Sequence, residues 1–151
     1  MKRRIVVTGA GVTSSLGFTP AELYQSLLAG KSAVRLMPEW QGLVPVGSDH
    51  ISAAPVAISP EKSKSIKRHY RRSMGNAALF ATLAAQQAVV ESGLAAEILG
   101  NGRAGCIISS TIGSSSEVYE STKAVIEHRF NDLSACQFFR IVSHSSAFNV
   151  A

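Results

Sequence analysis

Three stretches of the chain carry residues whose types and spacing could do chemistry. Gly9-Ala10-Gly11 follows a β-branched run, seven Lys, Arg and His side chains gather between residues 62 and 72, and a serine-rich stretch follows Ile107-Ile108. Such patterns can hold a dinucleotide, an acidic partner and a phosphate group, respectively. The residues that flank each stretch decide which of these uses is supported.

The Gly9-Ala10-Gly11 stretch does not fit a dinucleotide site. That site needs a third glycine three residues after the second, so that the following helix packs closely on the strand. Here the position is Ser14. No second strand with a terminal acidic residue follows either, because residues 31–47 are interrupted by proline and glycine. The two glycines therefore either only turn the chain or belong to a different motif.

The basic residues between 62 and 72 predict either a docking patch or a solvated helix face. Glu61 is the only acidic residue beside them. Like charges this dense repel one another unless a partner of opposite charge offsets them. The net charge of +5 and the isoelectric point of about 9.6 favour an acidic partner. Nucleic acid is the weaker choice, since no RNA-binding aromatic motif or helix-turn-helix spacing accompanies the charges.

Candidate nucleophiles and metal ligands are sparse. Cys106 and Cys136 lie far apart and share no metal-type spacing with the histidines, so we predict no disulfide and no metal site. We expect both thiols to be small buried side chains. The serine-rich stretch 109–116 lacks the Gly-Lys-Ser/Thr of a nucleotide loop and the Gly-x-Ser-x-Gly of a nucleophilic serine. No cofactor is expected, and we interpret all four histidines as structural: His50, His69, His128 and His144.

Two strands and a long helix are expected to position these residues. Ile5–Thr8 and Ala104–Ser109 are continuous apolar runs, which are typical of strands covered on both faces. Residues 73–92 are rich in alanine and free of proline, which predicts a helix that is apolar nearly all round and therefore buried. A strand, a buried helix and a second strand most simply form a right-handed crossover unit with parallel strands. The expected fold class is α/β.

The remaining segments predict a capped helix, an excursion and a further helix. Thr19-Pro20-Ala21-Glu22 has the residues of a capping box, and Gly30 is suited to end that helix in the left-handed conformation. Residues 32–60 contain four prolines and predict a long excursion with room for an edge strand. Residues 117–129 predict another helix, exposed on its charged face.

The length and composition are those of a globular domain. With 151 residues and 46% hydrophobic content, the chain is long enough for one ordinary core. No apolar run approaches the length of a membrane span, and the basic start leads into a strand without a cleavage site for a secretory signal. We therefore expect a cytoplasmic protein.

Taken in order, these motifs resemble the amino-terminal part of the β-ketoacyl-acyl carrier protein synthases, the condensing enzymes of fatty acid and polyketide synthesis. The resemblance rests on four segments: Met1–Gly17, Arg71-Arg72-Ser73-Met74 with the helix ending Ser92-Gly93-Leu94, Ala104–Gly113, and Phe138–Ala151. It implies a partial thiolase-like fold, with a mixed sheet layered between helices. The whole chain, residues 1–151, would be less than the first half of that fold.

The resemblance also implies the chemistry of the whole enzyme. Such enzymes perform a decarboxylative Claisen condensation with malonyl-carrier protein, using a nucleophilic cysteine and two histidines. Neither cysteine of this chain and none of its histidines has the matching context. We therefore expect no catalytic residue here and no activity from the chain alone.

The resemblance also implies roles for residues of this chain that lie outside the catalytic centre. Ile112 and Phe139 match positions that line the acyl-chain pocket and the dimer interface, although ordinary core packing is an equal alternative. Four basic residues match the region where the acidic acyl carrier protein docks: Lys67, Arg68, Arg71 and Arg72. The expected partners are acyl carrier protein and a second subunit, in a homodimer or a ketosynthase-type heterodimer.

Two alternatives remain open at this point. One is a non-catalytic subunit of the same fold, similar to a chain-length factor, which shapes the pocket of a heterodimer. The residue at the nucleophile position would distinguish it from the enzyme. The other is a free-standing binding module, which a cooperative melting transition of the isolated chain would favour.

Overall fold

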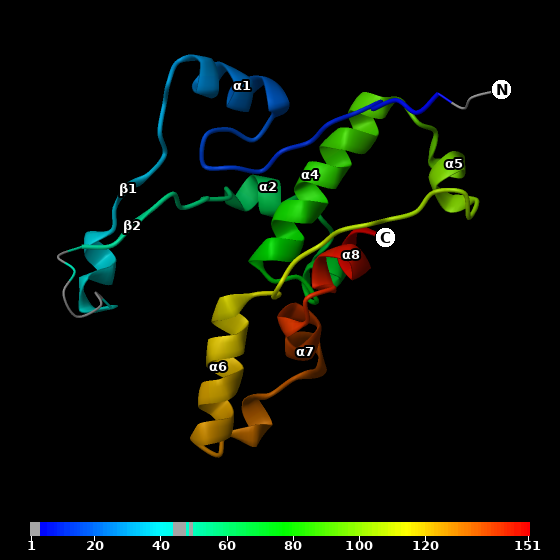
Figure 1. Ribbon diagram of the computed structural model, residues 1–151. Coiled ribbons are helices and arrows are strands. Elements are labelled where there is room, and N and C mark those ends of the chain that lie inside the picture. The colour runs from blue at the N-terminus through cyan, green and yellow to red at the C-terminus, as the bar shows by residue number, and fades with distance from the viewer. Residues whose placement is uncertain (1–3, 44–47, 49) are drawn as a thin grey trace.

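The computed structural model describes residues 4–43, 48 and 50–151 (Figure 1). Its helices and strands follow in chain order: α1 (Pro20–Leu28), β1 (Arg35–Leu36), the 3-10 helix η1 (Pro38–Leu43), β2 (Ser52–Ala53), α2 (Pro60–Lys64), α3 (Arg68–Arg71), α4 (Asn76–Ser92), α5 (Ala96–Gly100), α6 (Ser115–Ile126), the 3-10 helix η2 (Phe130–Asp132), α7 (Ala135–Ile141) and α8 (Ser145–Val150).

Helix α4 is the element around which the others are arranged. It ends, as predicted, at Gly93, which adopts the left-handed conformation with φ of 64°. Helix α8 packs along it. The expectation that α4 is buried all round is wrong, because its only buried residues are Ala78, Thr82 and Leu83, and Val90 is 81% exposed. The described parts of the chain cover only some of its circumference.

The two predicted central strands are extended but unpaired among the described residues. No ladder hydrogen bonds join Ile5–Thr8 or Ala104–Ser109 to a neighbour. Ile5 is 93% exposed and Ile107 is 99% exposed, so the expected burial of both segments is wrong. The described sheet instead has two strands, β1 and β2, which pair antiparallel within the excursion. A strand needs a neighbouring strand, and neither segment has one here.

Gly9 and Gly11 do not turn the chain; they let an extended segment lie directly on α4. A Cβ atom at Gly9 would overlap the carbonyl oxygen of Ala88, and one at Gly11 would overlap that of Ala84. Two extended residues advance about 6.6 Å and four helical residues about 6 Å, so the two spacings match. The segment therefore runs antiparallel to α4, at a distance that only glycine permits.

Side chains of α4 also bond the backbone of this segment. The Gln87 amide accepts from the Val12 N–H at 3.3 Å and donates to the Val12 carbonyl at 3.1 Å. Glu91 accepts from the Ala10 N–H at 2.5 Å, and the Thr13 hydroxyl donates to the Phe80 carbonyl at 3.2 Å. The backbone of residues 10–12 is thus fixed by a helix rather than by a strand.

Helix α1 begins as the sequence predicts. The Thr19 hydroxyl accepts from the Glu22 N–H at 3.2 Å, and Gly30 has φ of 63° just beyond the helix end. The Glu22 carboxylate reaches back one residue further than the capping box requires and accepts from the Phe18 N–H at 2.7 Å. That bond lowers the pKa of Glu22 from its ordinary value of 4.5.

Helices α6 and α7 form an arm that joins the rest of the molecule at Arg140. The Gly113 and Ser114 N–H groups donate to the carbonyls of Ile141 and Arg140, at 3.0 and 2.8 Å. The Arg140 guanidinium pairs with Glu117 at 2.9 Å and donates to the Arg72 carbonyl at 3.0 Å. One side chain therefore connects α6, α7 and the end of α3.

Candidate functional site

The basic residues lie on two short helices, α2 and α3, that lead into α4. The Ser59 hydroxyl caps α2 by accepting from the Lys62 N–H at 3.3 Å, and Pro60 occupies its first turn. Lys67 immediately precedes α3. Because the chain bends between the two helices, their basic side chains do not share one face, and each has its own surroundings.

Lys62 makes a contact within the molecule. Its ammonium lies 4.4 Å from the centroid of the Phe18 ring, a cation–π contact that joins α2 to the segment before α1. Phe18, Lys62 and Leu83 also line a cavity of about 330 Å³ together with Gln86, Gln87 and Val90. Lys62 therefore helps to position the basic region, while the residue itself remains exposed.

Arg71 is also turned towards the protein. Its guanidinium donates to the Ser63 hydroxyl at 3.2 Å, and its Nε atom is buried without a partner among the described residues. The residue is half-buried, whereas Lys67, Arg68 and Arg72 are exposed. Of the four residues predicted to dock an acidic partner, three present their charge outward.

Arg68 and Arg72 form the strongest concentration of outward charge. Together with His69 they line an open depression of about 530 Å³. The two arginines are four residues apart, which places them on the same side of α3 and of the turn that follows it. Arginine binds carboxylate and phosphate groups through two parallel hydrogen bonds, so this depression is suited to an anionic group.

Ile112 and Phe139 are both partly exposed, at 46% and 39%. Ile112 precedes the junction at which Gly113 bonds to α7. Phe139 stacks on Phe148 of α8, with centroids 5.3 Å apart and rings 13° from parallel. At these exposures, neither side chain is buried in the core of the described chain.

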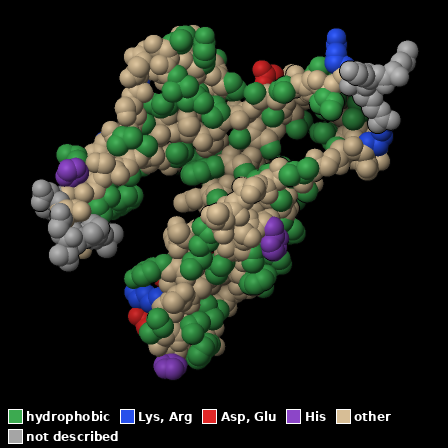
Figure 2. All heavy atoms as spheres, in the orientation of Figure 1, with side chains coloured by type: hydrophobic (Ala, Val, Ile, Leu, Met, Phe, Trp, Pro, Cys, Tyr) green, Lys and Arg blue, Asp and Glu red, His purple; other side chains and the backbone are tan. Residues whose placement is uncertain are grey.

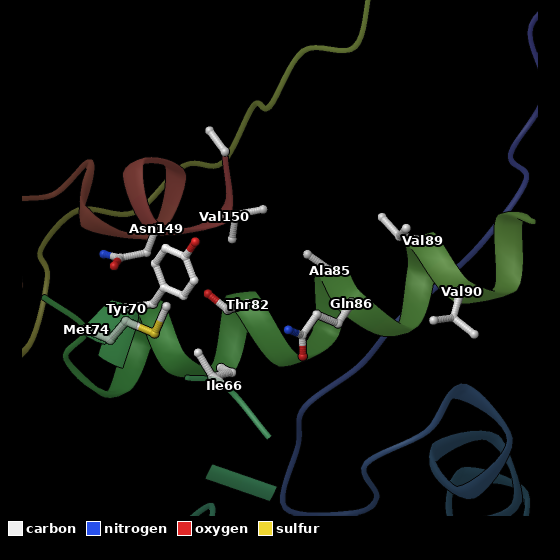
Figure 3. A pocket seen from close by; sticks show the side chains of 11 residues that line it. Ile66, Tyr70, Met74, Thr82, Ala85, Gln86, Val89, Val90, Asn149 and Val150 are labelled. Atoms are coloured by element: carbon white, nitrogen blue, oxygen red, sulfur yellow. The ribbon is translucent and has the colours of Figure 1, made fainter. Parts of the chain in front are cut away.

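A cavity of about 640 Å³ lies between α3, α4 and α8 (Figure 3). Tyr70 and Met74 form one end beneath α8, while Ala85, Val89 and Val90 continue along α4. No motif marked this cavity in the sequence, because its lining comes from separate segments and is mostly apolar. A third cavity, of about 390 Å³, lies between α6 and α7 and is lined by apolar residues such as Leu133 and Phe138.

No group of three His, Cys, Asp or Glu side chains in the described part of the chain is placed to hold a metal ion. Two N–H groups of the serine-rich turn, at residues 113 and 114, donate to carbonyl groups of α7. Cys106 is exposed and Cys136 partly so, contrary to the expected burial, because the segment around Cys106 is not in a sheet. Among the described helices, none has the length and apolar character needed to cross a membrane.

Residues 2–145 match the family described as "Beta-ketoacyl synthase, N-terminal domain". The chain is 36% identical, over 112 residues, to 3-oxoacyl-(acyl-carrier-protein) synthase 1 of Haemophilus influenzae. That match covers 74% of this chain and 26% of the relative. The chain thus spans about a quarter of the length of this curated relative.

Two solved structures show the same arrangement of elements. A β-ketoacyl synthase from Burkholderia phymatum superposes with a TM-score of 0.85 at 28% identity, over 99% of this chain and 36% of that one. The ishigamide ketosynthase/chain length factor superposes with a TM-score of 0.75 at 24% identity, over 100% of this chain and 37% of that one. The partial thiolase-like fold expected from the sequence is consistent with both.

Proposed function

The chain belongs to the β-ketoacyl synthase family, and from this premise we propose that it supplies the carrier-protein docking surface of a 3-oxoacyl-acyl carrier protein synthase. The complete domain would condense an acyl thioester with malonyl-carrier protein. In this proposal, residues 1–151 bind and orient the acidic carrier protein, and the chemistry takes place elsewhere in the domain.

The observation that carries the proposal is the outward pair Arg68 and Arg72. The two guanidinium groups line one open depression, and no acidic side chain lies within ion-pairing distance of either among the described residues. Lys67 adds a third exposed charge one residue before the helix. A carrier protein delivers a phosphopantetheine thioester on an acidic surface, and exposed arginines would speed its approach and fix its orientation.

Phe139 and Ile112 support a second part of the proposal. Both are half-exposed apolar residues, and the Phe139–Phe148 stack would offer a flat apolar wall to an acyl chain or to a second subunit. We propose that this wall is completed by the rest of the domain and by the partner subunit of a dimer.

The docking proposal is tested with a charge-reversed variant. We expect an acyl carrier protein to bind residues 1–151, and we expect Arg68→Glu with Arg72→Glu to raise the dissociation constant on the order of tenfold. The matched control is Lys31→Glu with Lys123→Glu, which changes the net charge equally on other elements. Equal losses of affinity in both double variants, measured by fluorescence anisotropy, would show that only the overall charge matters.

The absence of catalysis is tested on the same preparation. Residues 1–151 contain no matching nucleophile, so we expect no 3-oxoacyl product from acyl- and malonyl-carrier protein. Product formed by the purified chain would overturn this part of the proposal. The non-catalytic, chain-length-factor-like subunit remains the second candidate, and the residue at the nucleophile position of the complete domain distinguishes the two.

A further inference from the structure

The docking arginines and the apolar wall of Ile112 and Phe139 lie on two parts of the molecule that meet at one junction. Helix α3 carries the outward charges, and the arm of α6 and α7 carries the wall. Figure 1 shows α6 and α7 side by side, extending away from α4. In Figure 2 this arm shows mostly apolar and uncharged side chains, with its few visible charges near the free end. The junction therefore decides how the wall is placed relative to the docking surface.

Arg140 is the side chain that joins the two parts. Its Nε–H donates to the backbone carbonyl of Arg72 at 3.0 Å, and its Nη1 atom lies 2.9 Å from Oε1 of Glu117. Arg72 belongs to the docking pair, Glu117 lies in the first turn of α6, and Arg140 directly follows Phe139. A guanidinium has donors that point in two directions, so one side chain holds both partners at once.

The Arg140–Glu117 ion pair differs from the other ion pairs of the described residues. Its two side chains are 30% and 24% exposed, whereas those of the other pairs are at least 42% exposed. It joins residues 23 positions apart, while the partners in each other pair lie within four positions. Solvent and salt weaken exposed ion pairs more than partly buried ones. This pair is therefore suited to fix two elements relative to each other.

The backbone around Arg140 is closely packed. A Cβ atom at Gly113 would overlap the carbonyl oxygen of Arg140, and one at Gly75 would overlap the Ser114 side chain. Gly113 directly follows Ile112, and Gly75 directly precedes α4. The neighbours of both wall residues therefore meet the chain that leads from α3 into α4 within a single contact region.

We propose that Arg140 is a positioning residue of the condensing domain, which holds the wall of Ile112 and Phe139 in a fixed place relative to the docking helix α3. A carrier protein delivers its acyl group on a phosphopantetheine arm of limited length. The acyl chain therefore meets the wall only if the docking surface and the wall keep their spacing. The inference rests on the proposed function, because it takes α3 as the docking surface and the wall as facing the acyl chain.

The spacing between α3 and α7 is measured directly by pulsed electron paramagnetic resonance. One nitroxide label is placed at Lys67→Cys, next to α3, and the other at the native Cys136 of α7. Cys106→Ser removes the remaining thiol. With Arg140 present, we expect a single narrow distance peak.

Two arginine substitutions on the arm then separate the junction from general support of the fold. Arg140→Met should replace the narrow peak with a broad distribution, because the link from α7 to α3 is lost. The matched control is Arg129→Met, which removes ion pairs to Glu127 and Asp132 within the arm. The control should keep the narrow peak.

Acyl preference provides a readout that a merely structural role would not move. Fluorescence anisotropy gives the dissociation constants of unacylated and octanoyl-carrier protein for each variant. We expect the octanoyl form to bind the unsubstituted protein about threefold more tightly, because its acyl chain contacts the wall. Arg140→Met should abolish this preference while the dissociation constant of the unacylated form changes by less than about twofold. Arg129→Met should retain the preference.

A narrow peak or an octanoyl preference that persists in Arg140→Met would overturn the proposal, as would equal broadening in Arg129→Met. Equal losses of affinity for both carrier forms in Arg140→Met would show an effect of charge alone and would also overturn it. If Arg140→Met does not fold, Arg140→Lys takes its place, because lysine keeps the charge without the forked donors, and the same broadening is expected. Absence of carrier binding to the unsubstituted protein would instead refute the docking proposal, and the distance measurement would still decide the role of Arg140.

Discussion

The two faces of α4 differ in what they meet. One face, formed by Ala84, Gln87, Ala88 and Glu91, carries the extended segment of residues 9–12 in direct contact. The other, which includes Ala85, Val89 and Val90, borders an open cavity of about 640 Å³. Both faces are rich in small apolar residues, so composition alone does not distinguish them. The two faces differ in whether a segment of the chain with matching residue spacing packs against them.

On the face of α4 that carries residues 9–12, matched residue spacing takes the place of the hydrogen bonds of a β-ladder. Glycines two residues apart meet alanines four residues apart, and the side chains of Gln87 and Glu91 bond the backbone of residues 12 and 10. The open face has no such counterpart in the described chain, and its Val90 remains 81% exposed. If the two faces differ in their contribution to the free energy of unfolding, substitutions on them should have unequal effects.

The largest effect is expected at Gly11. Gly11→Ala would place a methyl group where the Ala84 carbonyl lies, so the segment must leave the helix or α4 must shift. We expect a loss of unfolding free energy of about 3 kcal/mol. Gly105→Ala is the matched control in the other extended segment, because no atom lies within 4 Å of its Cβ position. Its change should stay within about 0.5 kcal/mol in a denaturant titration. Similar losses in both variants would contradict the close contact.

A smaller effect is expected from the glutamines. Gln87→Ala removes both hydrogen bonds to Val12 and leaves the part-buried N–H and carbonyl of Val12 unpaired. We expect this to lower the free energy of unfolding by about 1–3 kcal/mol. Gln86→Ala, on the open face, removes an exposed side chain and should cost less than about 0.5 kcal/mol. Denaturant midpoints of the two variants measure the difference. If Gln86→Ala destabilised as much as Gln87→Ala, the two faces would not differ as proposed.

The smallest effect is expected from Glu22, in the first turn of α1. The pKa of Glu22 is lowered by the Phe18 N–H, with a smaller contribution from the charge of Lys62. A lowered folded-state pKa stabilises the protein above the unfolded value near 4.5, and this contribution is lost as the pH falls through the lowered pKa. The melting temperatures of the wild type and Glu22→Gln should therefore differ at pH 7 and converge below pH 4.5. A constant difference across this range would exclude the predicted linkage.

Local signals in the sequence predicted the helices better than the strands. The Thr19 cap and the left-handed ends at Gly30 and Gly93 depend on neighbours within a few residues. The runs Ile5–Thr8 and Ala104–Ser109 are apolar as strands are, but a strand forms only when distant residues pair with it. That pairing is not present in the described chain, so their expected burial was wrong.

The sequence identified the basic residues of the candidate site but did not indicate how their side chains are oriented. Charge density marked the run between residues 62 and 72 and the family resemblance selected four of its residues, yet neither revealed that Arg71 turns inward to Ser63. Nor did it reveal that Lys62, within the same run, lies over Phe18. These contacts depend on the bend between α2 and α3. The cavity beneath α8 was missed because its lining has no feature that separates it from ordinary helix packing.

The most direct test of the account is amide hydrogen exchange across residues 1–151. We expect slow exchange in the middle of α4, around Thr82 and Leu83, and at Val12, which the Gln87 side chain bonds. We expect exchange close to the unprotected rate at residues 5–8 and 104–109, where the backbone has no partner among the described residues. Protection of these two segments equal to that of α4, in the isolated chain, would contradict the claim that they are unpaired.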